Sequence, residues 1–339
     1  MKNHTVVCFG ELLLRLDTGV QRFSQAQQFQ AGYVGSEANV AVLLSRLGIH
    51  TRLTSVLPAN ELGSAARDHI RQHGIDTSSI LFREGRIGVF FSESAASLRP
   101  GHIIYDRAHS AFAELKPGEI DWKTVFKGAE WFHWSGISPA VSRNVALVCR
   151  EALQEARQAG LKISADFNYR SKMWKYGKHP AEVMPELLSY CDVIYGDIDT
   201  ATIYFDINTN PALSRDEALL SCGEALKKRL PHVKSLAMTF REQLPAGSQA
   251  YSGVLLHDRL YHSRVFELGT IVERIGTGDA FMGGLIYALL HEEEPQHAIN
   301  FAVAAGALKH AITGDAALTS RDEIESLLKT GSTFGRIIR

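Results

Sequence analysis

Beyond residue 125 the chain alternates short strand-like segments with segments of helical length, and this rhythm limits the folds open to it more than any other feature. The strand-like segments are residues 131–134, 161–166, 193–195 and 235–239, and the helical ones are residues 143–159, 180–190 and 216–230. Because a helix between two strands returns the chain for parallel pairing, the pattern predicts a mostly parallel sheet with helices on both faces. Residues 252–257 and 259–264 add a hairpin.

The first part of the chain follows the same rhythm except in two stretches. Residues 11–33 and 84–108 are rich in strand-like segments and lack a helical pattern. We expect these stretches to pair into a small sheet that stands off the main domain, as a lid over a substrate cleft does. The expected division is a core of residues 1–10, 34–83 and 112–339 and a β lid of residues 11–33 and 84–111.

Composition narrows the range of partners. The 339 residues are 45% hydrophobic and 22% charged, which fits one large α/β domain with an elaboration or two smaller domains. The formal net charge is -1, so we expect neither nucleic acid nor an anionic membrane as a partner. No apolar run approaches the roughly 18 residues of a membrane span, and no signal region opens the chain, so we expect a cytoplasmic protein. The four cysteines lie far apart and fit a reducing compartment.

The residues most informative about function form the turn Glu273-Arg274-Ile275-Gly276-Thr277-Gly278-Asp279, which precedes an apolar helix. A Gly-x-Gly turn that opens a helix leaves backbone N–H groups without partners, and the helix dipole favours a phosphate there. Gly276, Thr277 and Gly278 would form this anion hole, and the carboxylate of Asp279 would accept the proton of an attacking hydroxyl. Taken alone, these letters favour a simpler interpretation, in which Asp279 is an N-cap after a glycine turn.

The wider context favours the catalytic interpretation. Residues 273–290 (ERIGTGDAFMGGLIYALL) resemble the C-terminal signature of the PfkB, or ribokinase-like, carbohydrate kinases. Residues 32–41 (GYVGSEANVA) resemble the N-terminal sugar-binding segment of the same family, and the similarity spans essentially the whole chain. Within the family the chain most resembles the 2-keto-3-deoxygluconate kinases, through residues 105–111, residues 166–170 with Trp174, and the tail Gly335-Arg336.

This resemblance implies a ribokinase-like three-layer α/β/α sandwich with a mostly parallel central sheet and a small β-sheet lid. It also implies transfer of the γ-phosphoryl group of ATP, with Mg²⁺, to a hydroxyl of a sugar acid, for which 2-keto-3-deoxygluconate is the expected substrate. One alternative is another kinase of this fold, acting on fructose, ribose or a nucleoside; a second is a non-catalytic sensor of a sugar or nucleotide. The oligomeric state stays open, although an exposed lid edge could pair with a second copy in a homo-oligomer.

The substrate side of the predicted site combines neutral and cationic groups. Gly35 would let a sugar approach a strand-to-helix turn, and Asn39 could offer a donor and an acceptor to a hydroxyl. A guanidinium can grip a carboxylate through two hydrogen bonds, so Arg107 and Arg170 favour an acid over a neutral sugar. By resemblance Arg107 belongs to the keto-acid pocket, and Tyr105 could add a hydroxyl to the substrate.

The sequence indicates the nucleotide-binding residues less clearly than the substrate-binding ones. The resemblance puts Asn168 and Arg170 near the junction of substrate and ATP phosphates. Thr239 stands where the family has a Thr-x-Gly turn over the phosphates, with Arg241 in place of the glycine. Residues 300–309, beginning with Asn300, resemble the helix that packs against adenine.

Two departures from the family pattern concern the positions of its acidic residues. Glu273 replaces the usual aspartate, and the family's Asn-x-x-Glu motif, which organises magnesium through water, appears as residues 197–200. Asp197 can take the place of the asparagine, but Thr200 supplies no carboxylate, for which Asp199 could compensate. We therefore expect no direct protein ligand for Mg²⁺, which the ATP phosphates and water would hold.

Overall fold

The computed structural model of the chain describes residues 4–95, 99–244 and 248–331, so the signature at Gly335 and Arg336 lies outside the described residues. The strands of its large sheet are β1 (Thr5–Phe9), β4 (His50–Pro58), β5 (Ile80–Arg83), β8 (Trp131–Ser135), β9 (Lys162–Asp166), β10 (Val193–Tyr195), β11 (Ser235–Gln243), β12 (Gln249–Leu256), β13 (Leu260–His262) and β14 (Phe266–Leu268). The helices are α1 (Ser36–Arg46), α2 (Glu61–Arg71), α3 (Trp122–Val125), α4 (Ile137–Val141), α5 (Arg143–Gln158), α6 (Pro180–Leu188), α7 (Ile198–Phe205), α8 (Arg215–Arg229), α9 (Thr277–Leu290), α10 (Pro295–Lys309) and α11 (Arg321–Thr330).

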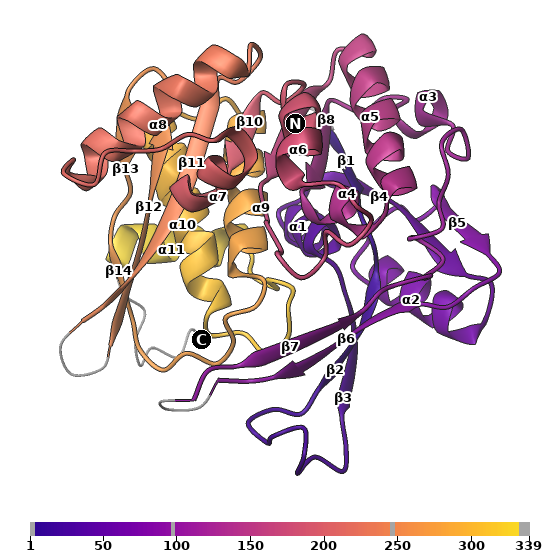
Figure 1. The fold of residues 1–339 in the computed structure, drawn as a ribbon. Helices are drawn as coiled ribbons and strands as arrows, with labels where there is room; N and C mark the ends of the chain where they lie inside the picture. The colour runs from indigo at the N-terminus through magenta and orange to yellow at the C-terminus, as the bar shows by residue number, and fades with distance from the viewer. Residues whose placement is uncertain (1–3, 96–98, 245–247, 332–339) are drawn as a thin grey trace.

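The large sheet is parallel over most of its width. Its order is β13-β12-β11-β10-β9-β8-β1-β4-β5, with β14 against β12. Every pair from β11 to β5 is parallel, whereas β12, β13 and β14 join the edge in antiparallel pairs. The prediction of a mostly parallel sheet with a hairpin at its end is therefore confirmed (Figure 1).

Helices cover both faces of this sheet, as the strand–helix rhythm predicts. One apolar cluster joins the sheet to α1, α2, α9, α10 and α11. A second cluster, on the other face, joins it to α3, α5, α6, α7 and α8. The result is a three-layer sandwich in which the central strands are buried on both sides, which is why these strands read as almost continuous apolar runs.

A second sheet, called here the small sheet, stands away from the sandwich (Figure 1). Its strands are β2 (Leu13–Asp17), β3 (Gln30–Val34), β6 (Gly88–Glu93) and β7 (His102–Asp106), in the order β3-β2-β6-β7. The two helix-poor stretches of the sequence thus pair with each other, through the parallel contact between β2 and β6. Leu13, Val34 and Phe90 form a small apolar cluster on one of its faces.

Short elements account for most differences from the sequence-based expectation. In the strand-rich stretch of residues 11–33, residues 18–29 form no strand, and β3 begins only at Gln30. Helix α7 was not anticipated because its β-branched residues resemble a strand; the side chain of Asp197 starts it by accepting the N–H of Thr200 at 2.6 Å. The four cysteines are buried and unpaired. Within the described ranges, none of the helices is both long and apolar enough to cross a bilayer.

Candidate active site

A cavity of about 470 Å³ lies between the small sheet and the carboxyl ends of the central strands. Parallel strands place their carboxyl ends along one edge of a sheet, where α/β proteins bind their ligands. The wall formed by the small sheet carries Leu13, Phe90 and Tyr105. The opposite wall is formed by the ends of β9, β10 and β11 together with the first turn of α9.

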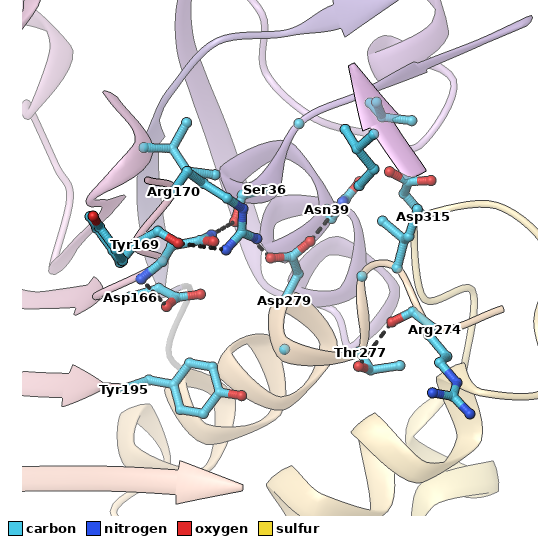
Figure 2. Close-up of a pocket in the computed structure, with 18 of the residues that line it drawn as sticks. Ser36, Asn39, Asp166, Tyr169, Arg170, Tyr195, Arg274, Thr277, Asp279 and Asp315 are labelled. Carbon is cyan, nitrogen blue, oxygen red and sulfur yellow. Dashed lines mark hydrogen bonds between the residues drawn. The ribbon is translucent and has the colours of Figure 1, made fainter. Parts of the chain in front are cut away.

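Asp279 lies in the first turn of α9 and is 9% exposed to solvent. Its two carboxylate oxygens accept hydrogen bonds from α1, one from the Ser36 hydroxyl at 2.6 Å and one from the Asn39 amide at 2.7 Å. The amide of Asn168 donates in turn to the Ser36 hydroxyl at 3.1 Å. Figure 2 shows the carboxylate of Asp279 between Ser36 and Asn39, with Arg170 next to Ser36. The carboxylate is therefore oriented by α1 toward the cavity.

The turn before α9 presents free backbone donors to this cavity. Gly276 is the N-cap residue, with φ of 83°, and a Cβ atom there would lie 1.8 Å from the carbonyl oxygen of Asp315. Only glycine fits both restrictions. The backbone N–H groups of Gly278 and Asp279 donate to no atom of the described chain. These groups and the amino end of the helix favour an anion.

Three buried carboxyl groups lie in the cavity or next to it, and burial raises the pKa of each. Burial raises the pKa of Asp279 to about 6, although the hydrogen bonds from Asn39 and Ser36 oppose this shift. Burial also raises the pKa of Asp166 to about 8 and that of Glu37 to about 7, and the negative charge of Asp279 adds to both shifts. At neutral pH Asp279 is thus mainly ionised and able to accept a proton, whereas Asp166 is mainly protonated.

The two arginines predicted for the substrate side differ in how far a carboxylate already neutralises their charge. Gly35, Tyr105, Arg107 and Arg170 all line the cavity. The Nε and Nη2 edge of Arg107 is bound at 2.6 Å by Glu11, whose side chain is 1% exposed, so most of this positive charge is already neutralised. Arg170 is exposed and forms no ion pair with any carboxylate in the described ranges; its Nη1 donates to the Tyr169 carbonyl at 3.1 Å. Arg170 is therefore the guanidinium with more charge to offer an acid.

The predicted nucleotide residues are only partly brought together. Thr239 and Arg241 line the cavity on β11, and Arg241 Nη2 donates to the hydroxyl of Thr277. Asn300 does not line this cavity; its side-chain oxygen accepts the backbone N–H of Arg264 at 2.8 Å. A separate cavity of about 140 Å³ borders the carboxyl end of α10, where Ala307 lies.

Residues that could position a metal ion are few. Asp197 lines the cavity but caps α7 through Thr200, and Asp199 does not line it. In the part of the chain that the structure describes, no three His, Cys, Asp or Glu side chains gather as a metal site would require. Asp197 is therefore the carboxylate of residues 197–200 that reaches the cavity.

Four residues of this region were given no role from the sequence. Ser36 and Asp166 fall inside segments singled out there, and Asp166 ends a parallel strand, which is a usable signal for a ligand-facing position. Glu11 and Asp315 gave no such signal, because their partners Arg107 and Arg15 lie far away in the sequence.

Known proteins share this fold over their whole length. The 2-dehydro-3-deoxygalactonokinase of Haloferax volcanii is 31% identical over 330 residues, which cover 96% of this chain and 97% of that protein. The crystal structure of 2-dehydro-3-deoxygluconokinase from Thermotoga maritima is 36% identical with a TM-score of 0.90, covering 96% of this chain and 99% of that one. A fructokinase structure with bound ATP from Xylella fastidiosa, 22% identical with a TM-score of 0.76, covers 97% and 99% and shares the fold.

Together the fold and these similarities define the class of protein as a ribokinase-like α/β kinase. The model of the pfkB family carbohydrate kinases matches residues 3–320, so the chain belongs to this family and is a carbohydrate kinase. The family resemblance inferred from residues 32–41 and 273–290 is thereby confirmed.

Proposed function

We propose that this kinase transfers the γ-phosphoryl group of ATP to a hydroxyl of a 2-keto-3-deoxy sugar acid, with 2-keto-3-deoxygluconate as the first candidate. The observation that carries the proposal is the position of Asp279, a buried carboxylate oriented by Ser36 and Asn39 beside free amide groups in a cavity that also exposes Arg170. Relatives that act on such acids at 31% and 36% identity support the choice of substrate.

In this proposal Asp279 accepts the proton of the substrate hydroxyl as that oxygen attacks the γ-phosphorus in line. The N–H groups of Gly278 and Asp279, with Gly276 and Thr277 shaping the turn, stabilise the charge that spreads over the transferred group. Mg²⁺ bound to the triphosphate would neutralise its charge, and Asp197 is the residue that would orient it through water.

The two substrates would approach from opposite sides of the α9 turn. The sugar acid would lie under the small sheet, between Gly35, Tyr105 and Arg107, with the small sheet acting as its lid. The triphosphate would lie along Asn168, Thr239 and Arg241, and the adenine would enter the cavity beside α10. Cytoplasmic placement and assembly into a homo-oligomer remain expectations from the sequence.

A coupled ADP-release assay tests the substrate class. We expect turnover with 2-keto-3-deoxygluconate or its galacto epimer and at least about 10-fold lower kcat/KM with fructose, ribose or adenosine, since a charge-assisted guanidinium–carboxylate contact is worth about 1.4 kcal/mol or more. Arg170→Met should reduce kcat/KM for the acid about 10-fold or more and leave a neutral sugar almost unaffected. Lys172→Met is the control, since Lys172 is an exposed cation in the same loop that does not line the cavity.

Two results would contradict the proposal. Faster turnover of fructose than of any sugar acid would make the chain a neutral-sugar kinase of the same fold. Binding of an acid and ATP without ADP release would support a non-catalytic sensor instead.

A further inference from the structure

Arg15 joins the small sheet to the two loops that frame the α9 turn. It is carried by β2, is 6% exposed and does not line the cavity. Its Nε donates to Ser92 at 2.9 Å and its Nη2 contacts Asp17, so half of its partners belong to the small sheet. Its other partners belong to the sandwich: Nη2 lies 2.9 Å from Glu273, and Nη1 pairs with Asp315.

Both partners in the sandwich hold the backbone of the α9 turn. One oxygen of Glu273 accepts the N–H groups of Arg274 at 2.9 Å and Ile275 at 3.1 Å, while its other oxygen faces Arg15. The carbonyl oxygen of Asp315 lies directly against Gly276. These contacts leave little free space, so a displacement of Arg15 would move both sides of the turn.

The chemistry of this cluster favours an arginine. A guanidinium offers five donors in a planar fork, so it can bind Ser92, Asp17, Glu273 and Asp315 at once, which the single ammonium of a lysine cannot do. Lys309 is fully buried nearby, but its Nζ donates to the Ile312 carbonyl at 3.0 Å. Among the described ion pairs, Arg15 is the cation that neutralises Glu273 and Asp315.

We propose that Arg15 is a positioning residue for phosphoryl transfer, which holds the α9 turn in its anion-binding geometry only while the small sheet is closed over the cavity. Closure of the small sheet and assembly of the anion hole are then one event. The inference rests on the proposed function for its catalytic consequence, but its structural part can be measured without any substrate.

The test compares Arg15→Met with Arg86→Met in the full-length chain. Arg86 lies just before β6 and pairs at 2.7 Å with the exposed Asp106 at the end of β7, so its removal deletes an arginine of the same region without touching the α9 turn. We expect Arg15→Met to speed amide hydrogen exchange of residues 273–280 on the order of 10-fold, because their support is lost. We also expect kcat to fall on the order of 10- to 100-fold with a KM for the sugar acid within about 3-fold, since a turn displaced by about 1 Å impairs the chemical step.

Two further variants keep the test decisive. Arg15→Lys keeps the charge but not the fork, and should recover only part of kcat. If Arg15→Met folds poorly because it leaves buried carboxylates unpaired, the double variant Arg15→Met/Asp315→Asn removes one of those charges and should restore folding but not kcat.

The inference is overturned if Arg15→Met, or the double variant, matches Arg86→Met in either exchange of residues 273–280 or kcat. The two failures are distinguishable. A wild-type chain that phosphorylates none of the acids would end the proposed function, whereas unchanged exchange in Arg15→Met would end only the role of Arg15.

Discussion

Replacing Gly276 by alanine should disable the anion hole while leaving most of the fold intact. The added Cβ would lie 1.8 Å from the carbonyl oxygen of Asp315, so the turn or the facing loop must retreat by about 1.6 Å to reach the 3.4 Å of an ordinary contact. A displacement of about 1 Å at a catalytic group costs on the order of 100-fold in rate, which sets the expected fall in kcat.

The same substitution should also reduce stability. Gly276 has φ of 83°, a region that costs a residue with a Cβ about 1–2 kcal/mol. Overpacking against Asp315 adds about 1–3 kcal/mol, so we expect a loss near 3 kcal/mol in the free energy of unfolding. Gly160→Ala is the matched control, because Gly160 has φ of 75° with no atom within 4 Å of its added Cβ and lies far from the cavity.

Steady-state ADP release and urea unfolding of both variants separate the two effects. Gly160→Ala should lose only the backbone term, about 1 kcal/mol, and keep its kcat. The reasoning is refuted if Gly276→Ala keeps kcat within about 3-fold of wild type, because the turn would then tolerate a displacement that should abolish its alignment.

Three other predictions concern charge and fit around the same cavity. The kcat/KM of the wild type should fall as pH drops through about 6, because burial raises the pKa of Asp279 to about 6 and only its ionised form accepts a proton. A flat pH–rate profile between about pH 5 and 7 would argue against Asp279 as the base. Burial raises the pKa of Glu37 to about 7, so its ionisation in the folded state lowers the free energy of unfolding as pH rises. Between about pH 5.5 and 8 this loss amounts to about 2 kcal/mol. In urea titrations at these two pH values, Glu37→Gln should therefore lose about 2 kcal/mol less than wild type. An equal pH dependence in both proteins would show that Glu37 is not the group responsible. Gly35→Ala should raise the KM of the sugar acid about 10-fold with little change in the KM of ATP, because its Cβ would lie 2.6 Å from the Glu11 carbonyl and push the substrate wall out of place; an unchanged KM for the acid would remove Gly35 from the substrate side.

The periodicity of the sequence was sufficient to predict the architecture. The alternation of apolar strands and amphipathic helices after residue 125 predicts the parallel sheet, and the two helix-poor stretches predict the small sheet. Short elements such as α7 were not predicted, because a single capping contact, made by Asp197, decides whether a β-branched segment becomes helical. Such a contact leaves no periodic pattern.

Within the candidate site, local motifs were informative and long-range partners were not. The glycine turn before Asp279 is visible because its residue types are themselves the requirement of the backbone. Arg107 was interpreted as a cation for the substrate acid, but its pairing with Glu11 depends on how the segments that follow β1 and β7 come together in space. Arg15 and Asp315, 300 positions apart, form a pair that no local pattern could indicate.

The most direct measurement is the turnover of Asp279→Asn with the sugar acid that the wild type uses, together with ATP binding by calorimetry. Asparagine keeps the size of the side chain but cannot accept the proton, so kcat should fall by about 1,000-fold or more while the Kd for ATP changes by less than about 5-fold. A variant that retains more than about a tenth of the wild-type kcat would contradict the central role given to this carboxylate.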